Sequence, residues 1–92
     1  MTTSDVAVQL GPERVADALR QEAVEKVKAA EGEVVLDFSS VARIDANAVG
    51  AMEELVDLAD GRSVKVTLRA VNTNVYKVLK LMKLAQRFCF QT

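Results

Sequence analysis

Apolar and polar positions follow two different periods along this chain. The run "EVVLDF" at residues 33–38 is apolar almost throughout, which predicts a strand buried on both faces of a parallel sheet. The segment "SVKVTL" at residues 63–68 alternates and predicts a second strand, and the shorter segments 5–10 and 87–90 fit two more. The pattern therefore predicts four short strands.

Between these strands, apolar residues recur every three or four positions, as they do on one face of a helix. A first helix is predicted over about residues 12–30, opened by Pro12, with inward-facing Val15, Leu19, Ala23, Val27 and Ala30. A second follows residue 45, with a stripe of Ala48, Val49, Met52, Leu55, Val56 and Ala59. A third spans residues 72–85, with Val75, Val78, Leu79 and Met82 inward and Lys77, Lys80 and Lys83 outward.

Strands and helices thus alternate along the chain. This order predicts an α/β fold: one small domain over residues 1–92, with a mostly parallel sheet of about four strands and helices packed on it. Three helices can cover one face of such a sheet or both. The short chain favours a one-sided or incomplete second layer.

The composition narrows the possible chemistry. The chain contains no histidine, which removes the commonest general base and metal ligand. Its one cysteine, Cys89, has apolar neighbours and is expected to be a buried, inert thiol in a reducing cytosol. No apolar run approaches the roughly 18 residues of a membrane-spanning helix, and the N-terminus lacks a signal-peptide pattern. We therefore expect a cytoplasmic domain without direct membrane insertion.

The net charge of −1 hides an uneven distribution. Residues 1–61 hold all 13 acidic residues and 5 basic ones, whereas residues 62–92 hold 7 basic residues and no acidic one. Either acidic and basic helices lie side by side and neutralise one another, or the second half presents a positive face to an acidic partner. The lysines of the third helix lack an aromatic or glycine-rich platform, so no nucleic acid is expected as a partner.

The segment "IDANAVG", residues 44–50, lies where the carboxyl end of a strand leads into a helix, which is the usual functional edge of an α/β sheet. A phosphate cradle would need several glycines and a lysine, but this segment has only Gly50 and carries Asp45. Acyl transfer would need a nucleophile beside a base, and Asp37 with Asp45 supplies too few ligands for a metal ion. We therefore predict no enzyme, and no catalytic residue, cofactor or metal.

Two segments together, "VVLDFSSVARIDANAVGAMEEL" and "GRSVKVTLRAVNTNVYKVLKLMKLAQRF", resemble the STAS domain, a family named for sulphate transporters and anti-sigma factor antagonists. The likeness covers about residues 33–90. It implies a non-catalytic bacterial protein that docks on other proteins. In the antagonists, Asp-Ser-Ser-Gly opens the helix, and an anti-sigma kinase turns off binding by phosphorylating the second serine.

In this sequence the motif reads Asp-Ala-Asn-Ala, so the position that corresponds to the phosphoacceptor is Asn47, which has no hydroxyl. Asn47 can still form hydrogen bonds and cap the helix in place of an unmodified serine. The partner-binding residues that the resemblance implies are Asp45, Asn47, Ala48, Val49 and Met52. Asp45 and Asn47 would orient the partner, and the three apolar residues would set how closely the helix packs.

Several interpretations stay open at this stage. Asp45 is a helix cap at the positive end of the helix dipole, a partner contact, or both, since a capping carboxylate at a loop tip remains partly exposed. The acidic outer face of the same helix is either solvated or meets a basic partner. Ser39 and Ser40 are either turn formers or alternative phosphorylation sites.

The function predicted first is regulatory: a relative of anti-sigma factor antagonists that lacks the phosphorylatable serine, stays in its docking-competent form and engages a kinase-like anti-sigma protein. The alternative is an accessory cytoplasmic STAS subunit of a bacterial lipid-trafficking ABC transporter that binds its ATPase. That role needs no phosphorylatable serine.

Overall fold

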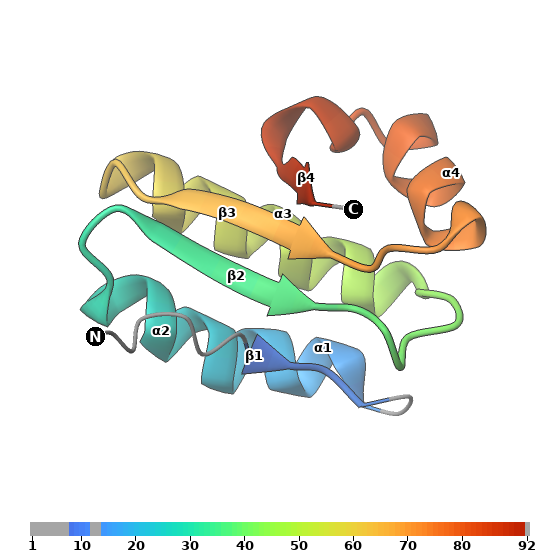
Figure 1. Cartoon of the computed structure of the whole chain (residues 1–92), viewed down its shortest axis with the longest axis horizontal. Helices are drawn as coiled ribbons and strands as arrows, with labels where there is room; N and C mark the ends of the chain where they lie inside the picture. Colours follow the sequence, from blue (N-terminus) through green and yellow to red (C-terminus); the bar gives the residue numbers. More distant parts are fainter. Residues whose placement is uncertain (1–7, 12–13, 92) are drawn as a thin grey trace.

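A four-stranded parallel sheet organises the chain, of which the computed structural model describes residues 8–11 and 14–91 (Figure 1). The strands pair in chain order, and they are β1 (Val8–Gln9), β2 (Glu33–Asp37), β3 (Lys65–Arg69) and β4 (Cys89–Gln91). In the register, Leu36 lies opposite Val8 on one side and Leu68 on the other. The α/β class and the parallel sheet of four strands are confirmed. Residues 5–7 of the first predicted strand and Pro12 lie outside the described residues.

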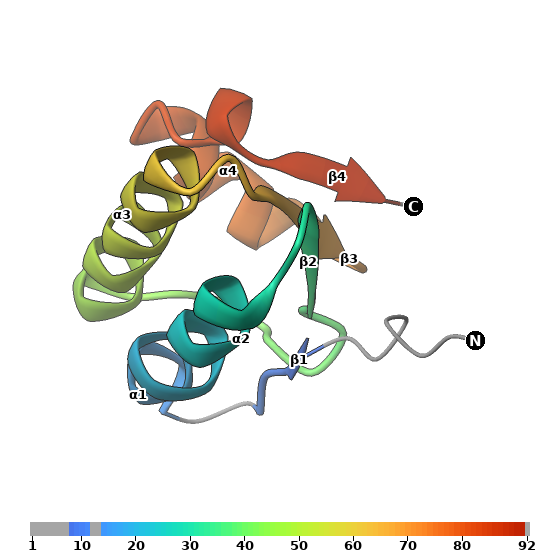
Figure 2. The ribbon, with the colours of Figure 1, turned by 90° about the vertical axis from the view of Figure 1, so that its left-hand side faces the viewer.

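The helices form one layer on this sheet. In chain order they are α1 (Val15–Ala18), the π-helical turn η1 (Leu19–Ala23), α2 (Val24–Ala29), α3 (Ala46–Gly61), α4 (Thr73–Leu81) and the short 3₁₀ helix η2 (Ala85–Arg87). Figure 2 shows α1, α2 and α3 on the same side of the sheet. Among residues 8–11 and 14–91, no helix is long and apolar enough to cross a membrane.

The other face of the sheet is open where the structure describes it. A shallow hollow of about 810 Å³ lies over it, and Val35, Thr67 and Cys89 occupy neighbouring register positions there. Val35 is partly exposed as a result. The expectation that β2 is buried on both faces is therefore wrong, because the crossover helices pack on one side.

The first helix contains a π-helical turn, and the spacing of its apolar residues explains why. Val15, Leu19, Ala23 and Val27 recur every four residues, and each step overshoots a turn of 3.6 residues by about 40°. In a uniform α-helix this stripe would drift away from the core. The wider turn at η1 takes up the excess. All four side chains stay buried, at 8% exposure or less.

The core lies between this helical layer and the sheet, and α3 supplies the largest helical share of it. Of α4, only Val75 and Leu79 are fully buried, while Val78 packs on the edge of the core. Met82 was expected to face inward, but it is 50% exposed. The reason is that α4 ends at Leu81 and Met82 is its C-cap, so the inward stripe stops one turn earlier than the sequence suggests.

Cys89 is exposed, contrary to the burial expected from its apolar neighbours. Successive side chains of a strand point to opposite faces of the sheet. Phe88 is buried toward the helices, so Cys89 points to the open face, where it lies opposite Thr67. In a sheet covered on one side, apolar neighbours therefore do not predict burial of the residue between them.

Candidate functional site

The segment 44–50, here called the α3 corner, turns the chain into α3. Asp45 is the N-cap of this helix: its backbone is extended, and its Oδ1 accepts a hydrogen bond from the N–H of Ala48 at 2.9 Å. The bond satisfies one of the amides that a helix start leaves free, and the carboxylate lies at the positive end of the helix dipole. Asn47 is the second residue of α3 and is exposed. Of the two residues predicted as possible caps, Asp45 is therefore confirmed and Asn47 is not, because Asp45 already fills that position.

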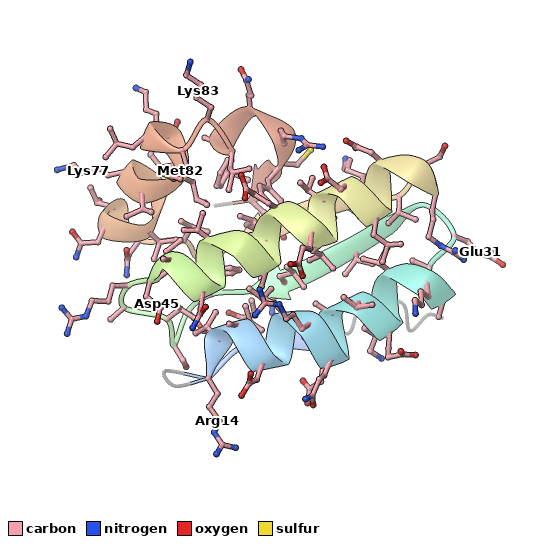
Figure 3. The ribbon with its side chains drawn as sticks, turned by 180° about the vertical axis from the view of Figure 1, so that it is seen from behind. Arg14, Glu31, Asp45, Lys77, Met82 and Lys83 are labelled. Carbon is pink, nitrogen blue, oxygen red and sulfur yellow. The ribbon has the colours of Figure 1, made fainter. Side chains whose placement is uncertain are left out.

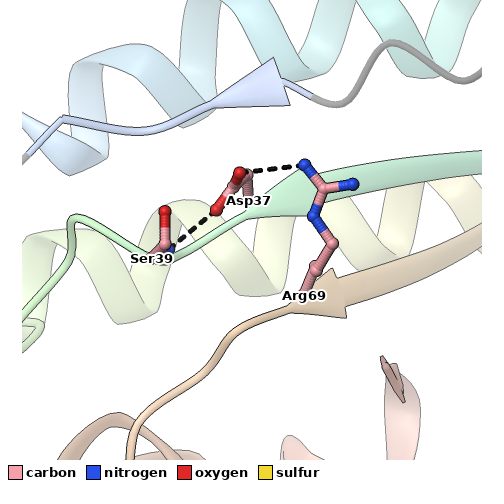
Figure 4. Close-up of polar contacts among 3 residues, drawn as sticks. All are labelled: Asp37, Ser39 and Arg69. Atoms are coloured by element: carbon pink, nitrogen blue, oxygen red, sulfur yellow. Dashed lines mark hydrogen bonds and ion pairs between the residues drawn. The ribbon is translucent and has the colours of Figure 1, made fainter. Parts of the chain in front are cut away.

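Asp37 fixes the start of the loop that leads to the corner (Figure 4). It ends β2 and is 7% exposed. Its Oδ1 accepts a hydrogen bond from the backbone N–H of Ser39 at 2.8 Å, and its Oδ2 accepts one from Arg69 Nη2 at 2.9 Å. These two contacts lower the pKa of Asp37 to about 2, and the hydrogen bond from Ser39 contributes more than that from Arg69. Near neutral pH this carboxylate is a structural anion and too weak a base to accept a proton.

Asn72 ties the same loop to the start of α4, and the sequence reading did not single it out. Its Nδ2 donates hydrogen bonds to the carbonyl oxygens of Val41 and Ala42, both at 3.0 Å. Its Oδ1 accepts one from the N–H of Val75 at 2.8 Å, which makes Asn72 the N-cap of α4. The polar residues before the apolar stripe of α4 predict such a cap. The two bonds to the distant loop have no local sequence signal.

A hollow of about 410 Å³ opens beside the α3 corner, between the start of α1 and the loop before α3. Its lining residues are Arg14, Val15, Ala16, Asp17, Arg43, Ile44, Asp45, Asn47 and Ala48. Figure 3 shows Arg14 and Asp45 at the same end of the molecule. Among these described lining residues there is no serine, cysteine or histidine. The hollow is lined by guanidinium, carboxylate and amide groups, which can form charge-assisted and neutral hydrogen bonds.

The predicted partner-binding residues separate into two groups. Asp45 and Asn47 are exposed at the corner, and their contact with a partner stays a prediction. Ala48, Val49 and Met52 are at most 6% exposed and belong to the core. Their predicted place on the contact surface is wrong, because the apolar stripe of α3 faces the sheet and leaves its polar face outside.

Ser39 and Ser40 form the turn after β2, and both are exposed. The hydrogen bond from the Ser39 N–H to Asp37 gives this segment the turn-forming role that was one of the two interpretations. Phosphorylation of either serine stays a prediction.

The acidic outer face of α3 is partly neutralised by basic residues. Arg87 Nη2 lies 2.9 Å from Asp57 Oδ1 and 2.6 Å from Asp60 Oδ2, contacts that raise the pKa of Arg87 above its ordinary value. Arg20 Nε lies 3.1 Å from Glu54 Oε1. Within the part of the chain that the structure describes, no ion pair is made by Lys77 and Lys80 of α4 or by Lys83 just after it. The acidic face of α3 is thus partly neutralised by arginines, whereas the lysines of α4 leave a positive face.

A family model described as the Mlab STAS domain matches residues 12–91. Since the match covers most of the chain, the protein belongs to this family of STAS domains, and the resemblance read from the sequence is confirmed.

One solved structure similar to this chain is a crystal structure from Thermotoga maritima, provisionally assigned as an anti-sigma factor antagonist. It superposes with a TM-score of 0.74, and the match covers 91% of this chain and 74% of the other. The two sequences are 17% identical, so the likeness shows a shared fold. A search of curated proteins found no match.

Proposed function

We propose that this STAS domain is a non-catalytic docking module that binds another protein through the α3 corner and is not switched by phosphorylation there. One observation carries the proposal: the exposed amide of Asn47 at the second position of α3, beside the capping carboxylate of Asp45. An amide can donate and accept hydrogen bonds with a partner, but it cannot accept a phosphoryl group as a serine hydroxyl does.

The rigidity of the corner supports a docking role. Asp37 holds the beginning of the preceding loop, and Asn72 holds its middle through two backbone carbonyls. A loop held in this way loses little conformational freedom when a partner binds, so less of the binding energy is spent on ordering it. The acidic outer face of α3 favours a partner that presents arginine or lysine side chains.

Two partner classes fit this proposal for a bacterial, cytoplasmic domain. The first is a kinase-like anti-sigma protein, with this chain as an antagonist that stays permanently competent to bind. The second is the ATPase of a lipid-trafficking ABC transporter, with this chain as an accessory subunit. The missing hydroxyl at Asn47 favours this second class, since a structural subunit has no need of a phosphorylation switch. Co-purification of the tagged chain from its native host distinguishes the two by the ATP-binding partner that it recovers.

The substitution Asn47→Asp tests the docking surface, because it adds a negative charge with little change in volume. We expect intact folding and about tenfold weaker binding of the co-purified partner, measured by calorimetry. Asn74→Asp is a matched control, because Asn74 is exposed and is the second residue of α4, as Asn47 is of α3. The control should bind like the wild type.

Equal affinities for the Asn47→Asp and wild-type chains would place the interface elsewhere and end this proposal. So would a phosphoryl group found on the α3 corner of the native protein, or turnover of a substrate by the purified chain.

A further inference from the structure

A second surface is formed by α4 and β4, and it leaves large apolar side chains uncovered. Tyr76 is 41% exposed and Phe90 is 37% exposed. Their rings contact each other edge to face, with centroids 5.3 Å apart and an interplanar angle of 74°. The pair therefore forms a fixed aromatic ridge between α4 and the edge of the sheet.

The strand beside this ridge has a free edge. β4 is the last strand of the sheet and pairs on one side only, with β3. All three of its residues are exposed. Proteins usually protect such an edge with charged residues, proline or a bulge, but β4 reads Cys-Phe-Gln and carries neither a charge nor a proline. Its outward backbone groups can accept another strand.

Two hollows flank the aromatic ridge. One, of about 570 Å³, is lined by Leu68, Ala70, Val71, Asn72, Thr73, Tyr76, Phe90 and Gln91. The other, of about 590 Å³, is lined by Tyr76, Lys80, Lys83, Ala85, Gln86 and Phe90. The lining of the first is mainly apolar, and the second is lined by two ammonium groups. Together they offer a place for an apolar side chain next to a place for a carboxylate.

Charge identifies the kind of occupant. Lys80 and Lys83 are exposed, and within the described residues neither makes an ion pair. Residues 62–92 contain no acidic residue, so nothing in this part of the sequence supplies a counter-charge. Lys83 is also held in place: its φ of 61° and the hydrogen bond from the Leu84 N–H to the Leu79 carbonyl oxygen close the end of α4.

We propose that β4 and α4 bind an extended acidic segment of a partner protein. The segment adds as a further strand along the free edge of β4, places an apolar side chain in the hollow beside Tyr76 and Phe90, and directs carboxylates toward Lys80 and Lys83. Main-chain hydrogen bonds supply affinity, and alternate side chains supply specificity. This surface lies outside the α3 corner, so the inference does not depend on the function proposed there.

The same features disfavour two other occupants. A second copy of this chain, paired strand to strand about a two-fold axis, would bring identical lysines together. An anionic membrane would contact exposed apolar and basic side chains such as Leu81, at 81% exposure, and Lys77. Neither of these residues lines either of the two hollows that flank the ridge.

A displayed library of short random peptides, selected on the intact chain, tests the proposal. We expect enriched peptides in which acidic residues alternate with apolar ones. In a titration followed by NMR, they should shift the ¹⁵N–¹H signals of the Phe90 and Gln91 backbone amides and the ¹³C–¹H signals of the Tyr76 ring. A proline inserted in the middle of an enriched peptide should abolish binding, because it removes a main-chain donor.

Two matched charge reversals locate the carboxylate contacts. Lys80→Glu should weaken the enriched peptide at least about tenfold, because a bound carboxylate would then face a like charge. Lys77→Glu makes the same change on the same helix outside both hollows and should alter affinity less than about twofold. Both residues are exposed, so both variants should fold.

Four results would overturn the proposal. They are selected peptides with no consensus or a basic consensus, equal effects of Lys80→Glu and Lys77→Glu, no NMR shift at β4, and a peptide affinity that the proline leaves unchanged.

Vesicles of phosphatidylserine and phosphatidylcholine form a separate experiment. If the chain binds these vesicles, and Leu81→Ser and Lys77→Glu abolish that binding equally, the occupant of this surface is a membrane and not a protein segment.

Discussion

The helices α3 and α4 both follow a strand and begin at a side-chain cap, yet they differ in how far the chain itself covers them. Seven of the sixteen residues of α3 are buried, and its outer face is polar and partly paired with arginines. Only two of the nine residues of α4 are buried, and it exposes Tyr76 and Leu81.

The difference separates two kinds of surface. The apolar stripe of α3 is buried in the core of the domain, so the surface that α3 exposes is polar and includes the α3 corner at its start. α4 leaves large apolar side chains exposed, and its lysines make no ion pair with the described residues. A helix that its own chain covers incompletely marks a surface on which further protein contact is favourable.

The largest test of this comparison is a pair of leucine truncations. Leu55 in α3 is fully buried, so Leu55→Ala should cost about 2–5 kcal/mol of unfolding free energy. Leu81 at the end of α4 is 81% exposed, so Leu81→Ala should change it by no more than about 0.5 kcal/mol. Urea unfolding followed by circular dichroism measures both. Similar losses would contradict the contrast between the two helices.

The next largest effect on the unfolding free energy should come from removing the N-cap side chains of α3 and α4. Asn72 caps α4 and also holds the loop before α3, whereas Asp45 caps α3 alone. We expect Asn72→Ala to cost about 2 kcal/mol and Asp45→Ala about 1 kcal/mol, since the first leaves more backbone groups without a partner. NMR should also show shifts at Val41 and Ala42 in the Asn72 variant. A larger loss for Asp45→Ala would show that the corner does not rely on Asn72.

Acid should weaken the α3 corner before it affects the surface of α4 and β4. The pKa of Asp37 is lowered to about 2 from 3.8, so its contribution is present above about pH 4 and is lost as the pH falls toward 2. We expect about 1–2 kcal/mol over that range, measured as the difference in urea stability between the wild type and Asp37→Asn. A wild-type pH profile that runs parallel to that of Asp37→Asn would show that Asp37 does not carry this stability.

The smallest effect concerns the ion pairs that join η2 to α3. Arg87→Gln should lower the urea midpoint slightly, and the difference should shrink at high salt because exposed pairs are screened. Lys77→Gln removes the same charge where no described ion pair exists, and it should leave the midpoint nearly unchanged. Equal shifts for the two variants would indicate a general effect of net charge.

Elements with a strong local period were predictable from the sequence. The alternation of β3 and the stripe of α3 each predicted the element and its inward face. The apolar run of β2 predicted the strand but not its inward face, because a run without alternation does not show that one face is open. The stripe of α3 should have excluded Ala48, Val49 and Met52 from the contact surface, because one side chain cannot serve the core and a partner at once. The family resemblance indicates which positions along the chain belong to the motif, but it does not indicate which side of the helix each residue faces.

Other features depend on contacts between distant segments. The exposure of Cys89 depends on which face of the sheet the helices cover, and that of Met82 depends on where α4 stops. The loop contacts of Asn72 join residues 30 and 31 positions apart, so neither partner carries a visible pattern. The π-helical turn is the exception, because the sequence itself carries its signal: the apolar residues of the first helix are spaced strictly four apart, where a uniform α-helix averages 3.6 residues per turn.

That turn also sets how the first helix is phased. α1 packs on α3, whereas α2 packs on both α3 and β2, and η1 joins the two halves. Deleting one residue within η1 would rotate one half against the other by about 100°. With α2 seated on the sheet, the wall formed by Arg14 and Asp17 would swing away from the α3 corner. The number of residues in one turn of helix thus determines whether the hollow beside the α3 corner has two sides or one.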